Sequence, residues 1–525
     1  MELLPLSSFL AIILATVPFL IAIHRRRQWE MCKYNLPPGP RPWPVIGNLN
    51  LIGSLPHRSI HELSKHYGPY MSLRLGSFPV VVGSSIDAAR FILKTNDQAF
   101  IDRPRTASGK YIHYNYSDML CAPYGAYWRQ ARKLFQTEIL SARQLSMLED
   151  VRVEEVRAML TDLHAAASTG HTIVLKDHLH MVSLNVISRM VLGKKYVVEE
   201  EASGSPVTPA EFRWMINEGF FLSGVLNVGD LIPWVNWLDP QGYVGRMKKV
   251  NKMFDRFLEH VIQEHNNRRR QEGQRFVAKD MVDLLLQLSD DPNLEVPIDR
   301  DGVKSFILDL IGAGTDTSSV TVEWAMSELL KAPEALAKAT EELDRVIGGD
   351  RFVTEADIPS LPYVEAIVKE TMRLHPVGPL LAPRLSREDV SVGGGGGGGG
   401  YNIPAGTRVF VNVWAIGRDP TIWGDDSSKF RPERFIGSSV DVKGQHMELL
   451  PFGSGRRMCP GIGLGLKMVQ VTLANLLLGF SWKLPNGVKP DELSMEEKYG
   501  LSMSRMVPLE TVAEPRLPAH LNMWP

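Results

Sequence analysis

A single cysteine near the end of the chain constrains the fold most, Cys459 in the stretch PFGSGRRMCPGIG over residues 451–463. Glycines on both sides let the main chain pass close to a flat ligand and aim N–H groups at the sulfur. A thiolate is a soft metal ligand, provided that its charge is stabilised and its orientation fixed. The apolar run over 461–480 predicts a buried helix whose N-terminal dipole favours that thiolate. A buried cysteine can also be just a small hydrophobic residue, so the spacing of the surrounding residues has to decide.

Composition narrows the class of protein. The 525 residues include three cysteines, Cys32, Cys121 and Cys459, which are too few and too scattered for a disulfide framework or a cysteine-rich zinc site. This usage indicates a reducing, cytosol-facing location. The net charge of −1 gives no indication of a nucleic-acid partner. A hydrophobic content of 44% is ordinary for a globular protein with a substantial core.

The N-terminus predicts a membrane anchor. No charged side chain occurs from Leu3 to Ile23, a length of roughly 30 Å as a helix, which is enough to cross a bilayer. The basic residues His24 to Arg27 follow at once, and positive residues stay on the cytosolic side, so the rest of the chain is expected in the cytosol. The alternative is a cleaved secretory signal, but the charges follow the apolar run and no strong small-residue cleavage site comes after it.

The remainder predicts a single domain that is mostly α with small β-sheets. We expect an anchor over 1–24, a basic linker and proline-rich hinge over 25–44, and a catalytic domain over 45–525, because closely spaced prolines form a stiff spacer and no later boundary or repeat occurs. Apolar residues between Val250 and Ile262 follow helical spacing. Strands are expected at 70–76, 78–84 and 407–414, and the glycine run 393–400 is expected to be a mobile hairpin tip.

Three further motifs carry chemistry. In IGAGTDTSS, the small pair Ala313-Gly314 lets a ligand approach a helix, and Asp316 beside Thr317 can hold a water for proton delivery. Local back-bonding within the helix is the alternative for these hydroxyl groups. The motifs KETMRLHP and YWRQARK each place two functional residues on one helix face, Glu370 with Arg373 and Trp128 with Arg132.

The pattern Phe452-x-x-Gly455-x-Arg457-x-Cys459-x-Gly461 resembles the haem-ligand signature of cytochromes P450, and the other motifs follow in the order of that family. The resemblance implies the cytochrome P450 fold with one N-terminal transmembrane helix. It implies haem b (iron protoporphyrin IX) with Cys459 as its axial thiolate and Phe452 covering the sulfur. It assigns proton delivery to Thr317 and Asp316, and a structural triad to Glu370, Arg373 and Arg434. Its haem-propionate partners are Trp128, Arg132 and Arg457, with Arg384 and Arg103 as further candidates.

The same resemblance predicts the reaction, which is insertion of oxygen from O₂ into an apolar substrate. Because the chain has no nucleotide-binding fingerprint, electrons must come from a separate protein, an NADPH–cytochrome P450 reductase at the endoplasmic-reticulum membrane. Arg129, Lys133 and Lys467 could form its docking patch. The family implies an oily substrate cavity. Its candidate wall residues are Phe220, Phe221, Leu380, Leu381, Leu501 and Met503.

Stretches such as AGTDTSSVTVEWAMSELLK resemble the plant microsomal P450s of the A-type clan. Within that clan the chain resembles grass enzymes that cleave nerolidol or geranyllinalool to the homoterpenes dimethylnonatriene or trimethyltridecatetraene. It also resembles flavonoid 3′-hydroxylase-like enzymes, so the expected substrate is a terpenoid alcohol or a flavonoid. A P450-fold isomerase or lyase that works without O₂ is the alternative from another class, and a non-catalytic haem carrier is a third.

Overall fold

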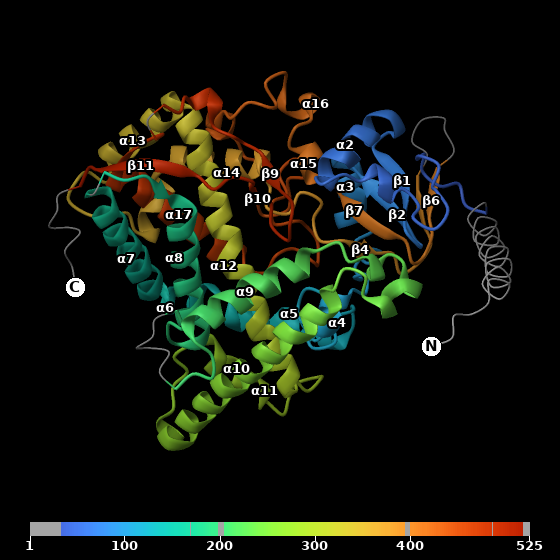
Figure 1. Ribbon diagram of the computed structural model, residues 1–525, viewed down its shortest axis with the longest axis horizontal. Coiled ribbons are helices and arrows are strands. Elements are labelled where there is room, and N and C mark those ends of the chain that lie inside the picture. The colour runs from blue at the N-terminus through green and yellow to red at the C-terminus, as the bar shows by residue number, and fades with distance from the viewer. Residues whose placement is uncertain (1–32, 169, 198–203, 394–399, 486, 518–525) are drawn as a thin grey trace, which may run out of the picture.

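The computed structural model describes residues 33–168, 170–197, 204–393, 400–485 and 487–517. Helices make up most of it, and a small sheet lies at one side (Figure 1). The prediction of a mostly α protein with small sheets is confirmed. The predicted anchor over 1–24 and the first part of the linker lie outside the described residues.

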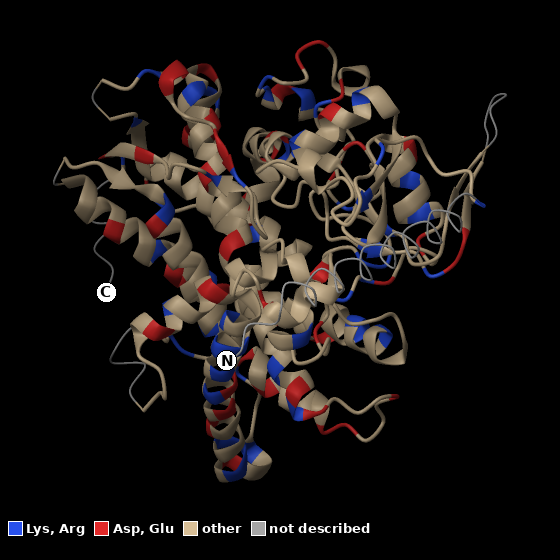
Figure 2. Ribbon diagram, turned by 45° about the vertical axis from the view of Figure 1, so that its right-hand side comes forward, with Lys and Arg blue, Asp and Glu red and all other residues tan. Residues whose placement is uncertain are grey.

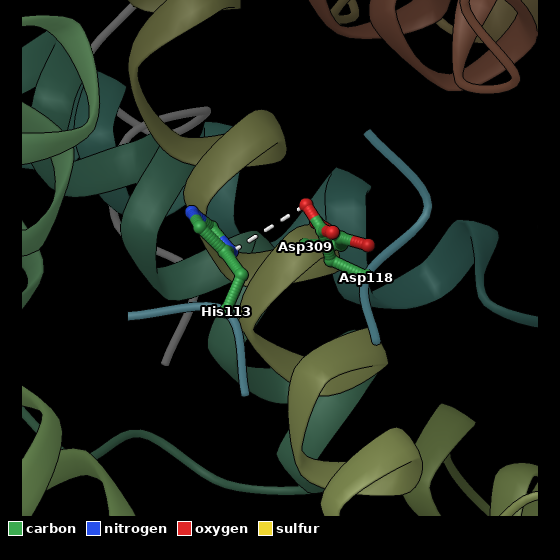
Figure 3. Close-up of side chains that lie close together, drawn as sticks. All are labelled: His113, Asp118 and Asp309. Carbon is green, nitrogen blue, oxygen red and sulfur yellow. Dashed lines mark ion pairs between the residues drawn. The ribbon is translucent and has the colours of Figure 1, made fainter. Parts of the chain in front are cut away.

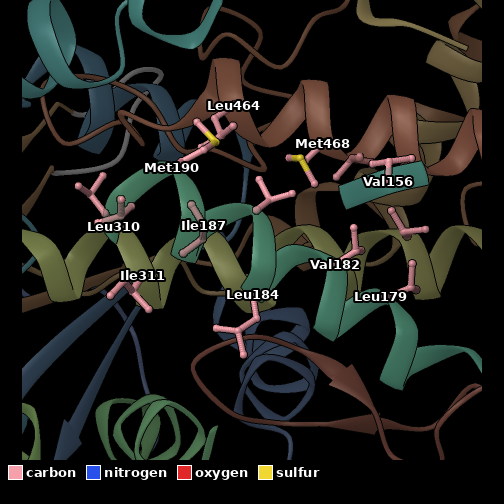
Figure 4. Packing of buried hydrophobic residues seen from close by; sticks show 14 of the residues in the cluster. Val156, Leu179, Val182, Leu184, Ile187, Met190, Leu310, Ile311, Leu464 and Met468 are labelled. Carbon is pink, nitrogen blue, oxygen red and sulfur yellow. The ribbon is translucent and has the colours of Figure 1, made fainter. Parts of the chain in front are cut away.

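Three helices form the centre of the core: α8 (Leu175–Leu192), α12 (Arg300–Lys331) and α17 (Ile462–Gly479). The Asp299 side chain caps α12 by accepting a hydrogen bond from the Gly302 N–H. Apolar side chains of the three helices interdigitate (Figure 4), and each buried side chain contributes about 1.5–3 kcal/mol. The core therefore forms around the two helices that carry the predicted motifs.

The α17 helix is long and apolar enough to cross a membrane, and it is the one such helix among the described residues. Most of it is buried inside the protein, as the run over 461–480 predicted, so it is a core helix. The α10 helix confirms the periodicity between Val250 and Ile262. The remaining α-helices are α2 (Pro56–Tyr67), α3 (Ile86–Arg90), α4 (Ala107–Tyr111), α5 (Ala126–Leu134), α6 (Ala142–Met147), α7 (Glu149–Ser168), α9 (Pro209–Gly224), α10 (Tyr243–Glu272), α11 (Met281–Ser289), α13 (Pro333–Val346), α14 (Pro362–Leu374), α15 (Val413–Ile416) and α16 (Pro420–Trp423).

The largest described sheet has the strand order β1-β2-β7-β4. Its strands are β1 (Tyr70–Leu75), β2 (Phe78–Gly83), β4 (Arg384–Leu385) and β7 (Arg408–Val411), and β2 pairs with β7 in parallel. The predicted strand over 407–414 ends early because Asn412 accepts a hydrogen bond from the Ala415 N–H and so caps α15. The other strands are β3 (Ile173–Val174), β5 (Val390–Val392), β6 (Tyr401–Ile403), β8 (Phe480–Lys483), β9 (Glu497–Lys498), β10 (Ser504–Arg505) and β11 (Glu510–Pro515).

The glycine run joins two antiparallel strands, β5 and β6, so the predicted hairpin is confirmed. Residues 394–399 of the run lie outside the described residues. The segment before the first helix packs on this hairpin and on β1. The Asn35 side chain donates to the Gly400 carbonyl at 2.7 Å, and the Ser72 N–H donates to the Pro38 carbonyl at 2.9 Å. The proline-rich segment is therefore bound to the sheet.

Charged residues of both signs are interspersed over the surface (Figure 2), and their numbers nearly balance, with a net charge of −1. Several form ion pairs between exposed side chains, such as Lys65 with Glu62 and Lys483 with Glu514. Exposed pairs of this kind contribute little to stability.

Candidate active site

Cys459 lies in the turn that leads into α17. Its N–H donates to the Phe452 carbonyl at 3.0 Å, and the Phe452 ring lies beside Gly465 of α17. The turn needs glycine at 455, because φ is +72° and a Cβ atom would lie 2.2 Å from the Leu93 carbonyl oxygen. The sulfur is thus held at the N-terminal end of the buried helix.

The surroundings of the Cys459 sulfur act on its charge in opposite directions. Burial raises the pKa of the thiol, whereas the Gly461 N–H and the Arg132 guanidinium favour the thiolate. A Cβ atom on Gly461 would lie 3.8 Å from the sulfur, so the glycine keeps that N–H close to it. A bound cation at this position would further favour the thiolate by offsetting its loss of hydration.

One small residue in the middle of α12 is accessible. Ala313 is exposed although most of the helix around it is buried, while Gly314 packs so closely on α8 that a Cβ atom would lie 2.3 Å from the Ile187 side chain. Cys459 is also partly exposed. The small pair thus has two functions: Ala313 leaves room on one face of α12, and Gly314 allows close helix packing on another.

The acid and the alcohol of α12 have different partners. The Thr317 hydroxyl donates to the Ala313 carbonyl at 2.9 Å, which is the back-bond that the sequence left as an alternative. The Asp316 carboxylate accepts a hydrogen bond from the Ser502 hydroxyl, and its other oxygen lies 4.0 Å from Nδ1 of His180. Asp316 thus connects α12 to α8 and to the segment before β10.

Three arginines, the buried Arg384 and the partly buried Arg103 and Arg457, lie close enough to repel one another. Burial and the neighbouring guanidinium groups lower the pKa of Arg103 to about 9, and that of Arg457 to about 10. Asp97 pairs with Arg384 at 2.6 Å. This excess of buried positive charge fits a ligand that carries carboxylates, because arginine binds carboxylates with two parallel hydrogen bonds.

The other predicted propionate partners lie beside this arginine cluster. The Arg457 guanidinium stacks 4.1 Å from the centre of the Trp128 ring, and the Trp128 indole N–H donates to the Met119 carbonyl at 3.0 Å. Arg132 donates to the Met458 carbonyl at 2.5 Å, next to Cys459. The structure therefore brings together Trp128, Arg132 and Arg457 with the two further candidates, Arg103 and Arg384.

The predicted triad is formed as expected. Both Glu370 oxygens accept hydrogen bonds from Arg373 at 2.7 Å, and Arg434 donates to the same carboxylate at 3.0 Å. Glu370 and Arg373 are almost completely buried. Arg373 also donates to the carbonyls of Ser427 and Lys429, so the triad fixes the segment that precedes the cysteine turn.

A family model described as Cytochrome P450 matches residues 37–506. The chain is a cytochrome P450. A Zea mays protein named trimethyltridecatetraene synthase is 51% identical over 507 residues, which are 93% of this chain and 90% of the relative. A second Zea mays relative, named dimethylnonatriene synthase, is 48% identical and covers 98% of this chain and 97% of its own length. An Arabidopsis thaliana flavonoid 3′-monooxygenase is 41% identical, with 97% of each chain covered.

Solved structures agree with this assignment. A zebra fish cytochrome P450 solved with abiraterone superposes with a TM-score of 0.72 at 26% identity, covering 88% of this chain and all of the other. This P450 is a monooxygenase, in keeping with its family and with relatives named monooxygenases and synthases. P450s hold haem iron through a cysteine thiolate, and the bound group supplies the O₂-activating chemistry. The Cys459 sulfur, the exposed Ala313 and the arginine cluster fit such a haem.

Sequence reasoning missed several polar residues of this P450. His180 and Ser502 contact Asp316, although no motif marks either of them. Asp309 was also missed, yet it precedes Ala313 by four residues and Thr317 by eight, which places all three on one helix face. This spacing could have identified Asp309 as a candidate site residue from the sequence. Of the predicted cavity residues, Leu380 and Met503 are buried in the core, and Phe221 packs against Tyr243.

Proposed function

We propose that this P450 cleaves a carbon–carbon bond of a terpenoid alcohol, nerolidol or geranyllinalool, and releases the homoterpene dimethylnonatriene or trimethyltridecatetraene. The observation that carries the proposal is the near full-length similarity, 51% and 48%, to two relatives named as synthases of these products. In such a cleavage the carbinol carbon leaves as a small ketone, while O₂ and two electrons are consumed. The family's preference for hydrophobic substrates supports an isoprenoid chain.

The proposal assigns roles to residues of the site. Cys459 would hold the iron of haem b through its thiolate, and Phe452 would shield the sulfur from water. Arg132, Arg384, Arg457 and Trp128 hold the propionates. The mutual repulsion of the buried arginines supports this role, because the propionate charges would relieve it.

Asp316 and Thr317 deliver protons during O₂ activation in this proposal. The hydroxyl lies one turn after Ala313 on the face where Ala313 is exposed, and the neighbouring carboxylate is connected toward His180 and Ser502. Rotation of Thr317 away from its back-bond would free the hydroxyl to hold a water.

The variant Thr317→Ala is expected to keep its haem but to lose coupling between NADPH use and product formation. Product formed per NADPH should fall about ten-fold or more, because a positioned proton donor is lost. The measurement is NADPH consumption and product yield in the same reconstituted reaction. Thr315→Ala is the matched control, since Thr315 is buried and makes the same kind of back-bond, to Ile311. An unchanged yield in Thr317→Ala would remove the proton-delivery role.

Electrons come, in this proposal, from NADPH through a cytochrome P450 reductase at the endoplasmic-reticulum membrane. Residues 1–24 anchor the protein by a single pass, residues 25–44 form the linker and hinge, and the catalytic domain over 45–525 faces the cytosol. The docking face includes Arg129 and Lys133 of α5, which are exposed. Arg129 lies 3.6 Å from Glu295, and Lys467 binds Glu355, so two of the three predicted cations have acidic partners.

Microsomes that contain this P450 and a reductase provide the test. Fed nerolidol and geranyllinalool, they are expected to release the two homoterpenes in an NADPH-dependent reaction, detected by mass spectrometry of the volatiles. Parallel microsomes with Cys459→Ala serve as the inactive control. Absence of homoterpene from both alcohols, in microsomes with intact haem protein, would refute the proposed substrate class.

A second candidate function is flavonoid 3′-hydroxylation, favoured by the 41% identity to the Arabidopsis thaliana flavonoid 3′-monooxygenase. Naringenin fed to the same microsomes separates the two candidates, because this activity would give a hydroxylated phenolic instead of a volatile. The isomerase or lyase alternative would require turnover of a fatty-acid hydroperoxide without NADPH. The adjacent Asp316 and Thr317 oppose it, since such a rearrangement needs no proton delivery.

A further inference from the structure

Asp309 is a partly exposed carboxyl group on α12, next to buried residues on both sides. It lies one helical turn before Ala313 and two turns before Thr317, on the same face. Asp309 therefore lies on the side of α12 on which Ala313 is exposed. A carboxyl group that is removed from water is costly unless it has a hydrogen-bond partner.

Three polar side chains from different segments converge at this position (Figure 3). His113, Asp118 and Asp309 each offer one atom within 4.8 Å of the others, and Nδ1 of His113 lies 3.7 Å from Asp118. Main-chain groups orient the two carboxyls. The Met119 N–H donates to Asp309 at 2.6 Å, and the Cys121 N–H donates to Asp118 at 3.0 Å.

One oxygen of this cluster lacks a hydrogen-bond partner. Asp118 is fully buried, and within the described part of the chain no donor reaches its Oδ1 atom. Buried carboxylate oxygens are nearly always hydrogen-bonded, so this one can accept a hydrogen bond from a further donor. The arrangement is fixed before the ligand arrives, because both carboxyls are held by main-chain N–H groups.

We propose that Asp118, Asp309 and His113 bind the hydroxyl group of an otherwise apolar substrate and so orient its hydrocarbon chain along α12. The inference rests on the proposed function, since it takes a terpenoid alcohol as the ligand. The hydroxyl donates to Oδ1 of Asp118 and accepts a hydrogen bond from Asp309 or His113. The three residues are positioning residues, distinct from those that hold haem or deliver protons.

The protonation of Asp118 and Asp309 favours binding of a neutral ligand. Burial and the nearby Asp118 carboxylate raise the pKa of Asp309 well above its ordinary value, which favours the neutral form that can donate a hydrogen bond. A bound divalent cation would instead require both carboxyls to be ionised side by side. The cluster therefore favours a hydroxyl over a metal ion.

The test is equilibrium binding to the purified holoenzyme, followed by the change in haem absorbance. The probes are nerolidol and an acyclic sesquiterpene hydrocarbon that lacks the hydroxyl. The wild type should bind the alcohol about 10-fold or more tightly than the hydrocarbon, because the analogue leaves buried polar groups unpaired. Asp309→Leu should remove this preference, and Asp309→Asn should retain part of it. Asp301→Leu, at an exposed position in the first turn of α12, is the matched control that keeps the preference.

An unchanged alcohol-to-hydrocarbon ratio in Asp309→Leu or, if that variant does not accumulate, in Asp309→Asn and Asp118→Asn together, would overturn the inference. So would a stoichiometric divalent metal in the holoenzyme that disappears in the Asp309 variants. Turnover is measured separately. If nerolidol is cleaved but the alcohol-to-hydrocarbon binding ratio does not depend on Asp309, only this inference is refuted. If the binding ratio depends on Asp309 but no cleavage occurs, only the proposed reaction is refuted.

Discussion

Cys459→Ala is expected to yield a protein without thiolate-bound haem and without measurable product. The sulfur is desolvated and held by the turn between Phe452 and α17, and no other described cysteine lies in that turn. Because the iron would lose its only covalent bond to the chain, the loss of thiolate-bound haem and of product should be complete. The measurements are the haem-to-protein ratio and the carbon-monoxide difference spectrum of the reduced protein.

Two comparisons make this result specific. Cys121→Ala is the matched control, because Cys121 is the other described cysteine and its buried thiol has a raised pKa. It should retain both haem and spectrum. Cys459→His should retain some haem, but with the spectrum of a neutral ligand. A thiolate-type spectrum in Cys459→Ala would show that position 459 is not the ligand.

Arg373→Leu is expected to destabilise the protein by about 3–5 kcal/mol, since it leaves the buried Glu370 carboxylate with much of its charge uncompensated. That is a large part of the 5–15 kcal/mol that typically holds a protein folded. The variant also loses the hydrogen bonds that Arg373 donates to the carbonyls of Ser427 and Lys429. Little correctly assembled haem protein should accumulate. Denaturant unfolding and the yield of holoprotein measure the effect.

The control for this variant lies on the same helix. Lys369 and Glu365 form an i,i+4 ion pair at 2.9 Å on the outer part of α14. Lys369→Leu should cost less than about 1 kcal/mol, because a partly exposed pair is screened by solvent. Equal losses from Arg373→Leu and Lys369→Leu would contradict a central structural role for the triad.

Residue spacing and periodicity were sufficient to predict those parts of this P450 that are encoded in short sequence motifs. The helix after Cys459, the Glu370–Arg373 pair and the first two strands could be predicted because spacing and periodicity determine them within a few residues. The strand over 407–414 was predicted too long. The Asn412 side chain accepts a hydrogen bond from the Ala415 N–H, so the chain begins helix α15 there instead of continuing as a strand.

Contacts between distant segments could not be predicted in the same way. The Met119 N–H and the Asp309 carboxyl lie 190 residues apart in the chain, and only packing of the loop before α5 on α12 brings them together. The mutual repulsion of Arg103, Arg384 and Arg457 has the same origin. The three arginines come from three separate segments of the sequence, and the excess of charge arises only where these segments meet.

The attachment of the proline-rich segment has a practical consequence for making a soluble form of this enzyme. Asn35 and Pro38 hydrogen-bond to the β5–β6 hairpin and to β1, so these residues belong to the folded body. A truncation that removes the apolar N-terminus should begin upstream of Tyr34, whose hydroxyl bonds Asp389 on the loop leading to the same hairpin. Cutting after the prolines would strip a flank of two strands and expose main-chain edges to self-association.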